Sequence, residues 1–132
     1  MKNRAGMIIA WICVGFVAAF NVFATVMKFV PVVPGSASDV MMQRLGLTVN
    51  MHHILGIVEG IIVVLYVIPR TSTVGFVLMV GYLAGALATN LTHGFSNMEA
   101  MPIYILFVLM MIAAYFRNPE LLARIRGQKI SA

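Results

Sequence analysis

Residues 51–91 read MHHILGIVEGIIVVLYVIPRTSTVGFVLMVGYLAGALATNL, and this stretch decides the fold. It contains two apolar runs, 51–68 and 74–91, separated by the turn sequence Pro69-Arg70-Thr71-Ser72. Each run is close to the ~17–20 residues that a helix needs to cross a hydrocarbon core about 30 Å thick. Because backbone polar groups in lipid must be satisfied within the segment, such runs form helices. The stretch therefore predicts two antiparallel transmembrane helices joined by a short turn.

The composition of the whole chain agrees with this interpretation. Of its 132 residues, 61% are hydrophobic and only 10% are charged, whereas soluble domains carry roughly a quarter charged residues. Two further apolar runs, 7–30 and 101–116, raise the expected number of helices to four. We therefore predict an all-α, polytopic membrane protein: a four-transmembrane-helix bundle that forms a single domain over 1–132, with a basic cytoplasmic tail at 117–132.

The first run has a second interpretation as a signal peptide, because Lys2 and Arg4 precede it. It is longer than the ~7–15 residues of a signal-peptide apolar region and lacks a clear small-x-small cleavage site, which favours a membrane anchor. The chain has one cysteine, Cys13, so an intramolecular disulfide is excluded.

The nine Lys and Arg residues predict the orientation of the helices. If the N-terminus is cytoplasmic, only Lys28 and Arg44 lie outside, and the other seven lie inside. Both termini are therefore expected in the cytoplasm. Since the basic residues lie at segment ends, orientation explains the net charge of +5 better than nucleic-acid binding does. We expect membrane lipid as a partner and no nucleic acid.

The first outer loop, 31–50, begins with two prolines that end the first helix. Ser36 stands three residues before Asp39, as in a helix-capping box. The stretch 40–45 that follows is amphipathic, so we expect a short helix lying on the outer membrane surface. A disordered loop remains the alternative.

Strongly polar side chains gather in the outer halves of the predicted helices. In the first helix, Asn21, Thr25 and Lys28 share one face at positions i, i+4 and i+7. In the second, Glu59 lies about 10 Å below His52 on the same face. The third helix carries a polar stripe at its outer end. We expect these residues to line one pocket, with the following ligand-binding candidates: Lys28, His52, Glu59, Tyr82, Thr89, Asn90 and His93.

Glu59 is the candidate catalytic residue. A carboxyl group costs about 2.5–3.5 kcal/mol in the centre of a membrane helix and faces the bundle interior with a partner. Lys28 is the natural partner, since it lies at a compatible depth. Three roles remain open: a buried ion pair that fixes packing, a ligand-orienting or proton-handling group, and an unpaired acid at a subunit contact.

The histidines do not predict a metal site. His52 and His53 are adjacent and diverge by about 100° on a helix, so they do not readily bind one ion together. His93 adds at most one further ligand. We therefore expect no bound metal.

Glycines at GxxxG spacing favour close packing of the second and third helices. The pairs are Gly56 with Gly60 and Gly81 with Gly85. Small residues at this spacing allow two helix backbones to approach. Whether the pairs also mediate a dimer stays open.

The chain resembles the DoxX-like family of small four-helix membrane proteins over nearly its whole length. The resemblance rests on the acid-containing segment Leu55-Gly56-Ile57-Val58-Glu59-Gly60, on Ile68-Pro69-Arg70-Thr71, and on Gly75. It rests further on Gly81-Tyr82-Leu83-Ala84-Gly85-Ala86-Leu87-Ala88-Thr89, on Arg117-Asn118-Pro119-Glu120-Leu121, and on Lys28. One position departs from the family pattern: a histidine often follows the helix-three threonine, where this chain has Asn90.

The resemblance implies a bacterial inner-membrane location and a redox or quinone association. Relatives include a subunit of thiosulfate:quinone oxidoreductase and a mycobacterial membrane component linked to oxidative-stress enzymes. No P-loop, GxSxG, HExxH or CxxCH pattern occurs in the chain, so its residues alone define no reaction.

Two hypotheses of function follow. In the first, the chain is a quinone-associated oxidoreductase component, and a protein partner brings the redox centre. In the second, it is a non-catalytic structural or assembly subunit of a larger membrane complex. Either hypothesis implies a membrane protein partner or a homo-oligomer, and small-solute transport is a third possibility that requires oligomerisation.

Overall fold

The computed structural model describes residues 4–129, and within this range the chain is helical with no strand. Four helices are long, and two α-helices and one 3-10 turn are short. In chain order they are α1 (Arg4–Met27), α2 (Ala37–Leu45), α3 (Val49–Val67), η1 (Pro69–Thr71), α4 (Ser72–Thr92), α5 (Met101–Arg117) and α6 (Pro119–Ile125).

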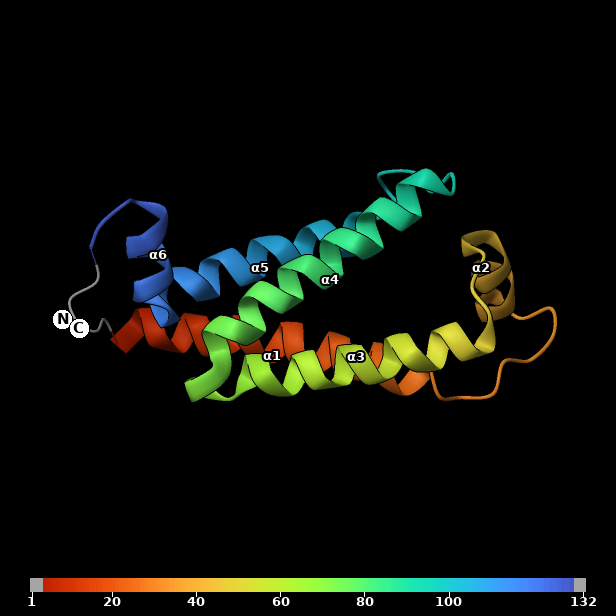
Figure 1. Cartoon of the computed structure of the whole chain (residues 1–132), viewed down its shortest axis with the longest axis horizontal. Helices are drawn as coiled ribbons and strands as arrows, with labels where there is room; N and C mark the ends of the chain where they lie inside the picture. The colour runs from red at the N-terminus through yellow and green to blue at the C-terminus, as the bar shows by residue number, and fades with distance from the viewer. Residues whose placement is uncertain (1–3, 130–132) are drawn as a thin grey trace.

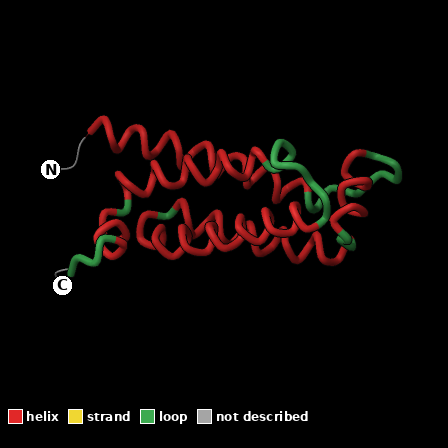
Figure 2. The backbone as a smooth tube through the Cα atoms, turned by 90° about the horizontal axis from the view of Figure 1, so that it is seen from above, coloured by secondary structure: helices red, strands yellow, loops and turns green. Residues whose placement is uncertain are grey.

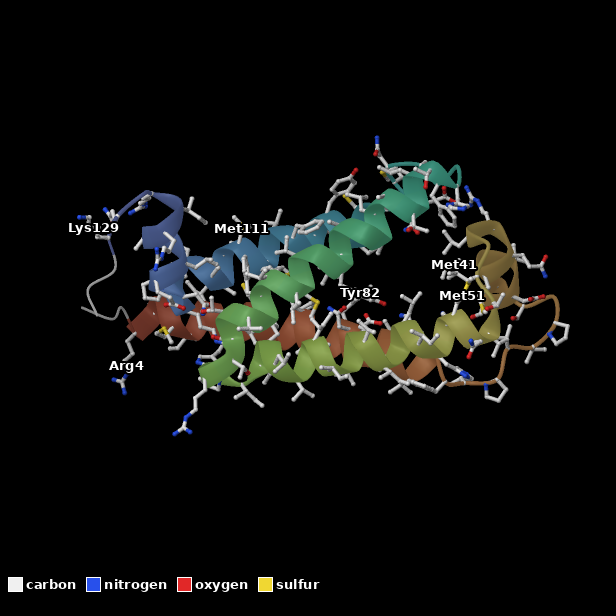
Figure 3. The ribbon with its side chains drawn as sticks, viewed as in Figure 1. Arg4, Met41, Met51, Tyr82, Met111 and Lys129 are labelled. Atoms are coloured by element: carbon white, nitrogen blue, oxygen red, sulfur yellow. The ribbon has the colours of Figure 1, made fainter. Side chains whose placement is uncertain are left out.

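The four long helices lie side by side in an elongated molecule (Figure 1). α1 packs between α3 and α5, and α4 packs against the same two helices from the other side. The connecting loops gather at the two ends of the molecule (Figure 2). Arg4 and Lys129 lie at one end, which we call the terminal end, and Met41 and Met51 lie at the opposite end, which we call the distal end (Figure 3).

Three of the described helical segments are long and apolar enough to cross a membrane: Arg4–Met27, Val49–Val67 and Pro69–Thr92. α5 qualifies as a fourth only together with α6, and the two are bent by 102°. The 17 residues of α5 correspond to about 26 Å at 1.5 Å per residue, slightly less than a hydrocarbon core. α5 is therefore the shortest of the four long helices.

The helix bounds differ from the sequence expectation at both ends of the chain. α1 ends at Met27 rather than near residue 30, because the approach to Pro31 disfavours helical backbone. The expected tail from residue 117 contains α6, which starts at Pro119 after the non-helical Asn118. Proline suits the first turn of a helix, since its missing N–H needs no partner there.

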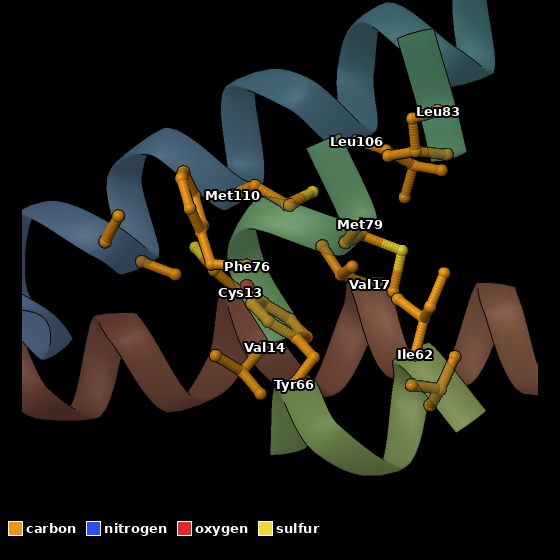
Figure 4. Close-up of a cluster of buried hydrophobic side chains, with 13 residues drawn as sticks. Cys13, Val14, Val17, Ile62, Tyr66, Phe76, Met79, Leu83, Leu106 and Met110 are labelled. Atoms are coloured by element: carbon orange, nitrogen blue, oxygen red, sulfur yellow. The ribbon is translucent and has the colours of Figure 1, made fainter. Parts of the chain in front are cut away.

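A hydrophobic core fills the terminal half of the bundle (Figure 4). Each long helix contributes buried side chains to it. They are Cys13, Val14 and Val17 of α1; Ile62, Val63 and Tyr66 of α3; Phe76, Met79 and Leu83 of α4; and Leu106, Met110, Ala113 and Ala114 of α5.

The backbones of α3 and α4 approach each other closely at Gly75. A Cβ atom there would overlap the backbone of Leu65 and Tyr66. Thr71, in the turn η1 between the two helices, donates its hydroxyl to the carbonyl of Leu65 at 2.8 Å. The turn and Gly75 together hold the two antiparallel helices in contact.

Cap interactions define α2. Ser36 accepts a hydrogen bond from the backbone N–H of Asp39, and the Asp39 carboxylate accepts one from the N–H of Gly35. Gly46 ends the helix at φ 68°, a left-handed conformation that glycine adopts without strain. The first connecting loop therefore contains a helix of nine residues.

Candidate functional site

A buried ion pair joins α1 to α3 in the distal half. The Nζ atom of Lys28 lies 2.7 Å from Oε2 of Glu59, and the two side chains are 15% and 3% exposed. Lys28 follows the last residue of α1, but its backbone N–H still bonds to the carbonyl of Ala24. It therefore keeps the helical register that places it on the face of Asn21. Lys28 is thus the partner of Glu59, as its compatible depth in the sequence suggested.

Tyr82 adds α4 to this pair. Its hydroxyl lies 3.2 Å from the same oxygen of Glu59, and the side chain points from α4 toward α1 and α3 (Figure 3). Both bonds reach Oε2, and no described residue donates a hydrogen bond to Oε1. Glu59 thus links three helices through one oxygen atom and retains a second acceptor.

The pair borders a cavity of about 540 Å³. All four long helices contribute to its wall, and most of the lining side chains are apolar. Met41 and Leu45 of α2 also line it, so α2 forms part of the distal wall. The polar residues of the wall are Asn21, Lys28, His52, Glu59, Tyr82, Thr89 and Asn90.

Six of the seven ligand-binding candidates therefore share one cavity, and His93 does not line it. Nδ1 of His93 lies 2.8 Å from the carbonyl of Thr89, which turns the ring back onto its own helix. Thr89 donates its hydroxyl to the carbonyl of Gly85 at 2.8 Å. His52 and Asn90 line the wall, but they are not hydrogen-bonded to Glu59.

His52 and His53 diverge, as the helical spacing predicts. His52 lines the cavity, whereas the ring of His53 stacks on Phe29 at 5.4 Å between centroids. Within residues 4–129, no three His, Cys, Asp or Glu side chains group closely enough to hold a metal ion.

The glycine pairs do not pack α3 against α4. Gly56 and Gly60 face α1: a Cβ at Gly56 would lie 2.8 Å from the ring of Phe29, and one at Gly60 would lie 3.4 Å from Thr25. A Cβ at Gly81 or Gly85 would meet nothing within 4 Å, and both glycines line the cavity. The GxxxG spacing alone did not show which helix each pair faces. On α4, the two glycines leave space in the wall of the cavity.

Arg44 links α2 to the loop between α4 and α5 at the distal end. Its guanidinium bonds Glu99 at 2.9 Å and the carbonyl of Gly94 at 2.7 Å, and it lies 3.7 Å from the ring centroid of Phe95. The hydrogen bonds from Arg44, followed by that from the backbone N–H of Ser96, lower the pKa of Glu99 to about 2. We call this set of contacts the Arg44 latch. Sequence reasoning missed it, because nothing in the residue spacing relates two loops 50 residues apart.

The terminal end is closed by a different set of polar contacts. Arg117 donates to the carbonyl of Val67 at 2.6 Å and stacks over the ring of Trp11. Asn118 donates to the hydroxyl of Ser72 at 2.9 Å. These bonds join the end of α5 to α3 and α4, and none of the residues that make them lines the cavity.

The fold and the site define a class of protein: a small helical membrane protein with a largely apolar cavity and a buried ion pair in one half. Its apolar helices indicate several membrane crossings. The chain belongs to the DoxX-like family, whose model matches residues 12–113. No curated protein and no solved structure matches the chain significantly.

Proposed function

We propose that the chain is a quinone-associated oxidoreductase component that binds a ring-shaped, lipid-soluble ligand in the distal cavity. The observation that carries this proposal is the Lys28–Glu59–Tyr82 cluster on the wall of the cavity. Intramembrane ionisable residues cost free energy and mark ligand or proton pathways. A polar cluster on an otherwise apolar wall is also the usual composition of a small-molecule site.

The residues present fit a quinone. A volume of about 540 Å³ lies in the range of small-ligand pockets, roughly 300–1,000 Å³, and it accommodates a substituted six-membered ring. A quinone brings two-electron, two-proton chemistry when bound. Lys28 has three N–H donors, of which two bond Glu59 and the carbonyl of Ala24. A carbonyl oxygen of the ligand can therefore accept the third.

Glu59 is the candidate proton-handling group. Its Oε1 atom receives no hydrogen bond from the described residues, so it is available to accept a proton or a hydrogen bond. Lys28 and Tyr82 both bond to the other oxygen, Oε2. The chain's residues thus orient the ligand and exchange a proton, while electrons come from a partner protein.

The test is mass spectrometry, with an absorption spectrum, on protein purified in mild detergent. Wild type should retain a quinone, and Glu59→Gln, which keeps the shape of the side chain, should lose it. Asp39→Asn is the matched control, because it makes the same carboxylate-to-amide change at a capping residue of α2 outside the cavity. Equal retention by wild type and Glu59→Gln would refute the role of Glu59.

A second candidate function is that of a structural or assembly subunit. The ion pair ties α1 to α3, and Tyr82 ties α4 to both, so the same cluster also holds helices together. A second, apolar hollow of about 460 Å³ beside Gly56 and Gly60 offers a surface for a partner helix or a second copy. This function predicts that a stable membrane protein partner co-purifies and that its complex is lost when the chain is deleted.

We propose for the placement of the chain that all four long helices cross the bacterial inner membrane as one domain. Both termini then lie in the cytoplasm and the distal cavity in the outer half. The distribution of Lys and Arg along the sequence supports this orientation. α2 is then a cover at the outer membrane surface. Its apolar side chains line the cavity, and its Arg44 bonds to the loop between α4 and α5.

A further inference from the structure

Asn21 is the deepest polar residue that lines the cavity from α1. It is 1% exposed, and its Oδ1 atom has no hydrogen-bond partner among the described residues. A buried polar atom without a partner costs about 1–3 kcal/mol, so such atoms are rare in folded proteins. The atom therefore requires a donor that the described residues do not supply.

The orientation of the Asn21 amide is fixed by its neighbour. Nδ2 donates to the carbonyl of Val17 at 2.8 Å, one turn earlier on α1. Exchanging the amide oxygen and nitrogen would place two oxygens in contact and lose this bond. The unpartnered group is thus an acceptor.

Glu59 presents a second acceptor to the same cavity. Its Oε1 atom receives no hydrogen bond from residues 4–129, while Oε2 receives two. Asn21 of α1 and Glu59 of α3 both line the largely apolar cavity, and each carries an acceptor without a donor among the described residues, which favours a ligand with hydroxyl groups. A carbonyl oxygen placed against Asn21 Oδ1 would instead bring two acceptors together.

From this geometry we propose that the cavity recognises the hydroxyl form of its ligand, a phenol or hydroquinone, through a hydrogen bond donated to Asn21 Oδ1. This inference rests on the proposed function and names the form of the ligand that the site prefers. The apolar wall holds the ring, and Asn21 distinguishes an O–H group from a C=O group of nearly the same shape.

The experiment compares a short-chain alkyl hydroquinone with the matching quinone, which is nearly isosteric. Binding to the purified full chain is measured by calorimetry under argon, with empty detergent micelles subtracted. A hydrogen bond to an otherwise unpartnered buried acceptor favours the hydroquinone by about tenfold in Kd. In Asn21→Leu, which removes the acceptor at similar size, this preference should fall below about twofold, while the quinone still binds.

Thr25→Val is the matched control. Thr25 lies one turn from Asn21, and its buried hydroxyl also has no partner, but it lines the other hollow and not this cavity. This variant should keep the tenfold preference. Retained binding of the quinone shows that Asn21→Leu is folded.

The outcomes separate this inference from the proposed function. If wild type binds both compounds equally, or the quinone more tightly, the inference is wrong and the proposed function stands. A preference that persists in Asn21→Leu also overturns it. If wild type binds neither compound, both proposals fail.

Discussion

Removing one member of the Lys28–Glu59 pair should lower the free energy of unfolding strongly. Removing both members should cost less than the sum of the two single changes. The two charges lie 2.7 Å apart with little exposure. At an effective dielectric constant of about 20, Coulomb's law gives an attraction of roughly 6 kcal/mol at this distance. Desolvation of two buried ions offsets several kcal/mol of that attraction.

A double-mutant cycle measures what remains. Lys28→Met leaves the carboxylate of Glu59 buried without its cation and should lower the free energy of unfolding by about 3–5 kcal/mol. Lys28→Met combined with Glu59→Gln should cost less than the sum of the single changes by about 1.5–3 kcal/mol. The free energies come from equilibrium unfolding of the purified chain in mixed micelles of mild detergent and sodium dodecyl sulfate, followed by far-UV circular dichroism.

The exposed pair Arg44–Glu99 provides the control cycle. Its side chains are 39% and 45% exposed, so solvent screens the interaction and the coupling should be much smaller. Additive costs for Lys28 and Glu59, or a coupling no larger than that of the exposed pair, would refute the argument that burial makes this contact strong.

Three further predictions concern packing, pH and orientation. Gly75→Ala should destabilise the chain by about 1–3 kcal/mol, because its Cβ overlaps the backbone of α3. Gly15→Ala should not destabilise the chain, because its Cβ meets nothing within 4 Å. Unfolding titrations compare the two variants. The pKa of Glu99 is lowered from 4.5 to about 2, so the contribution of the Arg44 latch is complete above about pH 4.5 and is lost as the pH falls toward 2. Amide exchange in α2, corrected for the intrinsic rate, should therefore stay slow at pH 5. Glu99→Gln should make this exchange faster at neutral pH. Equal exchange in wild type and Glu99→Gln would contradict the role of the Arg44 latch. In a cysteine-free background, Ser38→Cys should react with an impermeant maleimide in intact cells and Gln128→Cys should not, and the reverse pattern would overturn the proposed orientation.

Helical depth and face were sufficient to name Lys28 as the natural partner of Glu59. Lys28 follows the last residue of α1 at the distal end, and Glu59 lies about 10 Å below His52 on α3. A helix fixes both the depth and the face of a side chain. Only the packing order of the helices was needed to bring them together. The sequence placed Tyr82 among the ligand-binding candidates, but it did not predict the hydrogen bond from Tyr82 to Glu59.

Features that depend on the packing of neighbouring elements were not predictable in this way. The two glycine pairs have the same GxxxG spacing, yet Gly56 and Gly60 face α1 whereas Gly81 and Gly85 line the cavity. His93 follows the polar stripe of α4, but it lies at the end of the helix and bonds back to it. The Arg44 latch depends on loop conformations that no helical period encodes.

The structure also bears on which of the two proposed functions accounts for the whole site. A pair that served only to hold helices together would be best surrounded by close packing, because voids cost stability. Here the helix facing the pair carries Gly81 and Gly85, where side chains would meet nothing within 4 Å. Glycine in a helix interior costs about 1 kcal/mol relative to alanine, so two of them beside a hollow are unfavourable for stability alone. Asn21, with its unpartnered oxygen, and Glu59 line the same cavity as these two glycines, and occupation of the cavity by a hydroxylated ring would account for all of these features.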